Sequence, residues 1–170
     1  LLQETVYKGG IYALSFDTDT RALWYNKDIF EEAGLDPEAP PTTLDELIAA
    51  TEALTVRDGN GRTTRFGFNP VWDQAWLYTW GFDFEGEFQD PETLRITFSN
   101  PNNIAAMEWL KGFIDMIGIE DINGMIAACQ GTACSDANDY FWTGQSAMTC
   151  SGNWKVAQAK RYKPDVNYGV

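Results

Sequence analysis

Apolar and polar positions along this chain change between the twofold spacing of strands and the wider spacing of helices. The segment 11–16, Ile-Tyr-Ala-Leu-Ser-Phe, has apolar side chains in both alternating sets of positions, which predicts a strand covered on both faces. Polar residues at 17–20 interrupt the pattern, and residues 22–25 resume it. Further strands are predicted at 65–69, 145–150 and 166–170.

The helices of the first half are indicated by the residues at their ends. Asn26 is suited to cap a short helix, and Gly34 can end that helix in a left-handed conformation. Thr43 and Glu46 fit the capping box of a second helix, which carries an apolar stripe.

The second half contains one strong helix start and several weaker signals. Asn-Pro at 100–101 predicts a helix whose apolar spacing continues to Gly118. Residues 121–135 are rich in Ala and Gly, so an irregular segment is expected there. A short helix is predicted at 136–142 and a final helix ending near Tyr162.

Between these halves lies an aromatic segment. Trp72, Trp76 and Trp80 recur every four residues, which predicts that they lie along one side of a helix that Gly81 stops. With these elements the chain has a helix-rich α/β pattern, a mixed sheet flanked by helices.

Composition narrows the function more than the fold. The chain has 170 residues, which favours one domain, and its net charge of −13 makes nucleic acid and anionic membranes poor partners. It contains no His, so the commonest general base and zinc ligand are missing. No apolar run has the length of a membrane span, and no signal peptide opens the chain, which we expect to be a fragment of a longer protein.

The three cysteines suggest structural roles. Cys129 and Cys134 could close a small disulfide loop in an oxidising compartment, and Cys150 lies in an apolar run typical of a buried thiol. Their spacing does not match a zinc site, so no metal is expected.

Asp17 and Asp19 are the first candidates for chemistry. On an extended strand they would lie on one face, about 6.6 Å apart, and would repel unless a ligand, cation or water separates them. They could be the acid and base of a glycosidase, but glycoside cleavage needs carboxyl groups that flank the bond, and neighbouring positions on one strand do not. A role as ligand acceptors is therefore favoured over catalysis, and we expect a protein that is not an enzyme.

Three ordered motifs resemble the extracellular solute-binding proteins, family 1, of ABC transporters, the group related to maltose-binding protein. The first is Ala-Leu-Trp-Tyr-Asn-Lys-Asp at 22–28 with the Pro-Pro-Thr-Thr start at 40–43, and the second is the aromatic segment that ends at Trp80. The third is Phe-Trp-Thr-Gly-Gln-Ser-Ala-Met-Thr at 141–149, which continues into Ser-Gly-Asn-Trp at 151–154. The sequence departs from the family at Asn153, where Pro is usual.

The resemblance implies the class II type of periplasmic-binding-protein fold, in which two α/β lobes close on a solute by hinge bending. Residues 1–170 are expected to form a single lobe, the second, with 10–17 as a strand that crosses the hinge. The chain would be the substrate-binding component of an ABC importer, which captures a sugar or oligosaccharide and delivers it to the membrane permease subunits. A monomer without cofactor is expected, in the periplasm or as a cell-surface lipoprotein whose signal sequence lies outside this stretch.

The resemblance also suggests the ligand-binding residues. Aromatic faces and a few fixed polar acceptors suit a sugar, which has apolar C–H faces and a rim of hydroxyls. The expected ligand-binding residues are Asp17, Asp19, Trp72, Trp80, Gly152 and Trp154. Trp24, Trp109 and Trp142 are assigned to packing. An acidic, Trp-containing cleft would also accept a cationic solute such as a polyamine, which remains an alternative.

Overall fold

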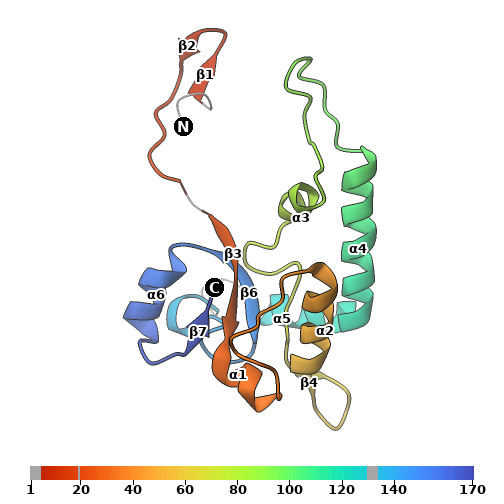
Figure 1. Cartoon of the computed structure of the whole chain (residues 1–170), viewed down its shortest axis with the longest axis vertical. Helices are drawn as coiled ribbons and strands as arrows, with labels where there is room; N and C mark the ends of the chain where they lie inside the picture. The colour runs from red at the N-terminus through yellow and green to blue at the C-terminus, as the bar shows by residue number, and fades with distance from the viewer. Residues whose placement is uncertain (1–4, 19, 130–133) are drawn as a thin grey trace.

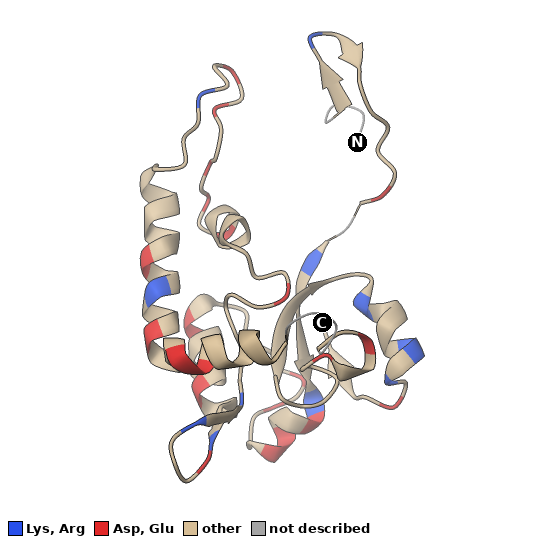
Figure 2. Ribbon diagram, turned by 180° about the vertical axis from the view of Figure 1, so that it is seen from behind, with Lys and Arg blue, Asp and Glu red and all other residues tan. Residues whose placement is uncertain are grey.

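The computed structural model describes residues 5–18, 20–129 and 134–170. Most of the chain forms one body in which helices surround a small sheet, and two segments project from that body on the same side (Figures 1 and 2). These segments are the N-terminal arm, residues 5–18, and the connection between α3 and α4, residues 84–100. The C-terminus lies in the body beside the sheet.

The sheet has β3 (Arg21–Asn26) in the middle, between β6 (Met148–Gly152) and β7 (Tyr168–Gly169). Both pairings are antiparallel, and an isolated parallel bridge joins Phe66 to Ser146 ahead of β6. Every residue of β6 is buried, which explains its continuous run of apolar and small residues. Strands are present near 22–25, 145–150 and 166–170 as expected, but β6 begins at Met148 and ends at Gly152, and β7 is limited to Tyr168–Gly169.

The helices of the first half agree with their sequence signals. Asn26 caps α1 (Lys27–Glu32), since its side chain accepts a hydrogen bond from the backbone of Ile29, and Gly34 has a φ of +77°. The complete capping box of Thr43 and Glu46 begins α2 (Leu44–Leu54).

The aromatic segment forms less helix than its spacing suggests. Only α3 (Leu77–Asp83) is helical, so Trp72 lies outside the helix and Trp76 is its N-cap residue. The prediction of one tryptophan stripe was wrong, as was a stop at Gly81. Gly81 is instead buried where the ring of Phe88 and the side chain of Asn103 leave no room for a Cβ.

Two helices meet in the second half at one glycine. Asn100 caps α4 (Pro101–Ile117), and Gly118, at a φ of +103°, separates it from α5 (Ile119–Ala128). The expectation of an irregular segment at 121–135 was wrong for 121–128, which belong to α5, and its part at 130–133 lies outside the described residues. Ile122 and Met125, three residues apart, bury one face of α5, and this spacing was the signal that the Ala and Gly content obscured.

The remaining elements are short. A 3-10 turn, η2 (Asp136–Asn138), replaces most of the helix expected at 136–142, and the last helix, α6 (Lys155–Tyr162), ends where predicted. The strand expected at 65–69 was wrong for most of its length, since β5 (Thr63–Arg65) ends at Arg65 and only an isolated bridge follows at Phe66. β5 pairs with β4 (Val56–Arg57) in a hairpin.

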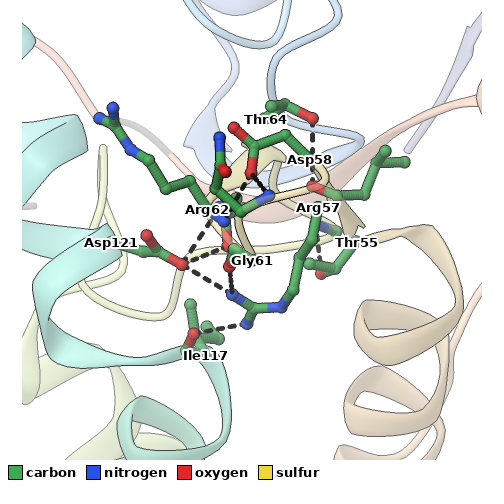
Figure 3. Close-up of polar contacts among 12 residues, drawn as sticks. Thr55, Arg57, Asp58, Gly61, Arg62, Thr64, Ile117 and Asp121 are labelled. Carbon is green, nitrogen blue, oxygen red and sulfur yellow. Dashed lines mark hydrogen bonds and ion pairs between the residues drawn. The ribbon is translucent and has the colours of Figure 1, made fainter.

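The hairpin β4–β5 is held to the helices by a polar cluster (Figure 3). Arg57 donates to the carboxylate of Asp121 at 2.7 Å and to the carbonyl of Ile117 at 2.7 Å, so it joins the end of α4 to the start of α5. Asp121 also accepts hydrogen bonds from the backbone and side chain of Thr63.

The N-terminal arm contradicts one prediction. A two-residue pairing of β1 (Val6–Tyr7) with β2 (Gly10–Ile11) is followed by a segment without regular pairing, so 11–16 is not a covered strand. The side chain of Phe16 is fully exposed, and Leu14 is 80% exposed. Apolar alternation marked side chains suited to burial, but no described neighbour covers them.

The core lies between the sheet and the helices α1 to α5. A second cluster beneath α6 contains Trp24, Phe141 and Trp142, so Trp24 and Trp142 pack as expected, and Trp109 packs against the main core. A disulfide bond joins Cys129 to Cys134, the pair that the sequence offered as one possibility. Cys150 is a buried free thiol, as predicted. Within the described residues, no helix is both long and apolar enough to cross a membrane.

Candidate functional site

The turn between β6 and α6 carries the strongest candidate side chain. Gly152 ends β6, and a Cβ at this position would overlap the six-membered ring of Trp154. The indole therefore lies directly against the backbone of Gly152, which only glycine permits. Trp154 is half-buried, so part of the residue remains accessible to solvent.

Arg21 completes this turn from the neighbouring strand. It is the register partner of Gly152, and its guanidinium carbon lies 4.9 Å from the centre of the Trp154 ring. This cation–π contact is worth about 0.5–1 kcal/mol at a partly exposed site. It helps to fix the orientation of the indole at the end of the sheet.

A second turn, residues 72–75, lies against β6. The ring of Trp72 stacks on Tyr140, with centroids 6.0 Å apart and planes inclined by 27°. The backbone N–H of Gln74 donates to the carbonyl of Cys150 at 3.1 Å, which ties the turn to the strand. Asp73 in this turn has a φ of +56°, a conformation that costs free energy for residues other than glycine.

A buried lysine connects the two turns. The Nζ of Lys155 is 2.9 Å from a carboxylate oxygen of Asp139 and 3.4 Å from one of Asp73, and its side chain is 1% exposed. The same nitrogen lies 5.1 Å from the ring centre of Trp142 and 5.6 Å from that of Phe141. Carboxylates and aromatic faces together replace the water that this cation has lost.

A hollow of about 420 Å³ lies beside β3, between the start of α2 and α3. Arg21, Trp80, Asp83 and Cys150 are among its lining residues. Burial, supported by the nearby charges of Asp73 and Asp83, raises the pKa of Cys150 to about 11. A larger hollow of about 570 Å³, between α1 and α2, contains none of the candidate residues.

The residues expected from the sequence do not all share one surface. Gly152 and Trp154 form one turn, and Trp72 stands on the next turn. Trp80 is 4% exposed, and its indole N–H donates to the carbonyl of Pro70 at 2.8 Å, so it forms part of the core and of the hollow's wall.

Of the two candidate carboxylates, the structure describes only that of Asp17, which lies in the arm. Asp17 is exposed, and its Oδ1 accepts a 2.7 Å hydrogen bond from the backbone N–H of Thr18. Asp19 lies outside the described residues.

Sequence reasoning missed Arg21, Asp73, Tyr140 and Lys155. The contacts of Lys155 reach 16 residues back to Asp139 and 82 residues back to Asp73, and no local spacing records such contacts. The only available signal was position, since Asp73 and Lys155 each directly follow a tryptophan already chosen.

The helix-rich α/β body, with aromatic side chains on turns at one end of its sheet, has the fold of the periplasmic binding proteins. The chain belongs to the bacterial extracellular solute-binding protein family, whose profile matches residues 1–170.

Relatives with assigned roles are also periplasmic binding proteins. The sn-glycerol-3-phosphate-binding periplasmic protein UgpB of Salmonella typhimurium is 28% identical over 182 residues, and UgpB of Escherichia coli K12 is 27% identical. The alignments cover 95% of this chain and 35% of each relative. The chain thus spans about a third of the length of these relatives.

Solved structures show the same fold. CpMnBP1 with mannobiose bound is 34% identical with a TM-score of 0.87, and its mannotriose complex is 33% identical with a TM-score of 0.88. Both matches cover 99% of this chain and 42–43% of CpMnBP1. A solute-binding protein of Thermotoga lettingae TMO bound with α-D-tagatose, 24% identical with a TM-score of 0.71, supports the fold alone.

Proposed function

We propose that this chain is part of a solute-binding protein that captures a short oligosaccharide and delivers it to the permease of an ABC importer. The observation that carries the proposal is the Gly152–Trp154 turn, which presents a half-buried indole in a lobe similar to the mannobiose-bound and mannotriose-bound CpMnBP1 structures. An indole face suits the C–H face of a pyranose ring.

The proposed contacts divide into stacking and polar groups. Trp154 is the main stacking surface, Gly152 allows close approach of the backbone, and Trp72 adds a second aromatic edge. Asp17 and Asp19 are proposed to accept hydrogen bonds from sugar hydroxyls, because an ionised carboxylate can accept from two hydroxyls at once. Trp80, whose indole N–H is already bonded, contributes at most the wall of the adjoining hollow.

Residues 1–170 are proposed to form one lobe, with 10–17 as the hinge crossing to another lobe. The exposed apolar side chains of Tyr12, Leu14 and Phe16 support this arrangement, because such a run is stable in water only when another surface covers it. A protein of this kind would bind without turnover, act as a monomer, and work in the periplasm or as a cell-surface lipoprotein.

The choice of a saccharide rests on identity and charge. The manno-oligosaccharide complexes are more similar to this chain than UgpB is, at 33–34% against 27–28% identity. The net charge of −13 opposes the approach of an anion such as glycerol 3-phosphate. A neutral sugar meets no such barrier.

Titration calorimetry on the protein at its natural length tests the proposal. Mannobiose and mannotriose are expected to bind without being cleaved, and sn-glycerol 3-phosphate and spermidine are expected to bind much more weakly. Replacing Trp154 by Ala removes an aromatic contact worth about 2–3 kcal/mol, so affinity should fall roughly 30- to 150-fold.

Trp76→Ala is the matched control. Trp76 is half exposed, and its ring contacts Tyr78 at a ring distance of 5.5 Å. Among the described residues it has no ring contact with Trp72 or Trp154, so its removal should change affinity less than twofold. Tightest binding of spermidine, cleavage of any glycoside, or equal losses for both tryptophan variants would contradict the proposal.

A further inference from the structure

Lys155 holds together three segments that are distant in the chain. Its Nζ contacts Asp139 at 2.9 Å, in the turn that carries Tyr140, and Asp73 at 3.4 Å, in the turn that carries Trp72. Lys155 is itself the residue after Trp154 and begins α6. One cation therefore contacts the turns on which both proposed stacking residues stand.

The burial of Lys155 is unusual for its chemistry. A lysine side chain normally keeps its ammonium group in water, yet this one is 1% exposed. Helix α6 begins at the surface, and its neighbours Val156 and Ala157 are exposed. A Met or Leu would fill the same space without the cost of burying a charge, so the ammonium group serves a purpose beyond filling volume.

The conformation of Asp73 provides a second, independent observation. Its φ of +56° is uncommon for a residue other than Gly, although Asp and Asn adopt it more readily than other side chains do. Such positions persist where the surroundings fix them. Its carboxylate is fixed by Lys155 and by the hydroxyl of Thr149, which donates from β6 at 3.4 Å. The turn of Trp72 is thus fixed in a disfavoured shape by groups from β6 and α6.

We propose that Lys155 is a positioning residue of the solute site, which fixes the turn of Trp72 relative to the turn of Trp154. This role rests on the proposed function insofar as those rings stack on a solute. Without the cation, the carboxylates of Asp73 and Asp139 would repel each other, and each would have to turn toward water. The Trp72–Tyr140 pair would then move relative to Trp154.

The test compares Lys155→Met with Lys155→Arg and Lys27→Met in the protein at its natural length. Met keeps the length of the stem without the charge, and Arg restores the charge. Lys27 pairs with Glu38 at 2.6 Å near α1, so Lys27→Met removes a paired lysine from another part of the fold. Calorimetry with mannotriose should show at least a tenfold loss for Lys155→Met, less than threefold for Lys155→Arg, and less than twofold for Lys27→Met.

A second measurement needs no ligand. In protein labelled with 5-fluorotryptophan, the ¹⁹F resonances of Trp72 and Trp154 should shift or broaden in Lys155→Met, while that of Trp109 stays in place. Asp73→Asn, which tolerates the positive φ but lacks the charge, should move the Trp72 resonance and keeps the proposal testable if Lys155→Met does not fold.

The outcomes separate the two proposals. If the parent protein binds no saccharide, the proposed function fails, and the ¹⁹F spectra still decide whether Lys155 positions the turns. Unchanged Trp72 and Trp154 resonances in folded Lys155→Met would overturn the positioning role. So would an equal shift of Trp109, which would indicate general loosening of the fold.

Discussion

At the scale of single residues, the end of the sheet depends on the missing side chain of Gly152. Because Gly152 has no Cβ, the ring of Trp154 lies on the backbone, and Arg21 lies within cation–π distance of that ring. The sequence indicated the Gly–Trp pair as a ligand turn. It gave no sign of Arg21, whose position relative to Gly152 follows from the pairing of β3 with β6.

The buried thiol of Cys150 should be chemically inert in the folded protein. With its pKa raised to about 11, its thiolate fraction at pH 8 is roughly two orders of magnitude below that of an ordinary cysteine. Without reductant, alkylation by iodoacetamide at pH 8 should be slow in buffer and rapid in denaturant, as followed by mass spectrometry. Rapid labelling in buffer would show that the interior opens readily around β6.

At the scale of elements, helix ends were predicted better than helix interiors. The caps of α1, α2 and α4 were correct, because a cap is made by side chains three residues from the groups that they bond. The spacing of Trp72, Trp76 and Trp80 misled, since a spacing of four residues is compatible with a helix but does not require one. In α5, the high Ala and Gly content drew attention away from the apolar spacing of its buried face.

The capping box of α2 makes a measurable contribution to stability. Thr43→Ala removes the acceptor for the backbone N–H of Glu46 and should destabilise the protein by about 1 kcal/mol, or about 2–4 °C in Tm. Thr43→Ser keeps the hydroxyl and should lie within about 0.5 kcal/mol of the parent. Thermal and urea unfolding measure the stability of both variants. If Thr43→Ala is as stable as the parent protein, water replaces the hydrogen bond of the cap.

At the scale of the whole molecule, polar contacts join elements that the sequence places far apart. Figure 2 shows acidic residues spread over many elements of the body, and Asp121 is one that pairs across the fold. Burial acts to raise the pKa of Asp121, but hydrogen bonds from Thr63 and Arg57 outweigh burial and hold that pKa below its ordinary value. The contact between the β4–β5 hairpin and the α4–α5 junction depends on the charge of Asp121, so the stability that this contact provides should vary with pH (Figure 3).

Asp121→Asn should reveal this coupling. A carboxylate whose pKa is lowered on folding stabilises the protein above its unfolded pKa of about 4, and this contribution is lost as pH falls through the folded pKa. The variant should therefore be about 1–2 kcal/mol less stable at pH 7, and the difference should shrink below about pH 4.

Urea unfolding from pH 7 to pH 3 measures the effect. Asp115→Asn is the matched control, because Asp115 forms an exposed pair with Lys111 and should change stability by less than about 0.5 kcal/mol. A stability difference for Asp121→Asn that is the same at every pH would rule out the charge as its cause.

The sequence by itself determined the starts of three helices and the family. The Asn26 cap, the Thr43–Glu46 capping box and the Asn100–Pro101 start are set by residues within one turn of a helix, where the chain has few alternatives. The Gly152–Trp154 turn is likewise set by neighbouring residues. The order of such motifs along the chain was enough to predict the class of fold.

Only the tertiary structure decided which side chains are enclosed and what they contact. Trp80 is buried and Trp72 is paired with Tyr140, although both belong to one series of tryptophans that recur every four residues. Lys155 is enclosed because segments up to 82 residues away converge on it. Burial and ion pairing depend on contacts between distant segments, and the free energy of such contacts is not encoded in the spacing of neighbouring residues.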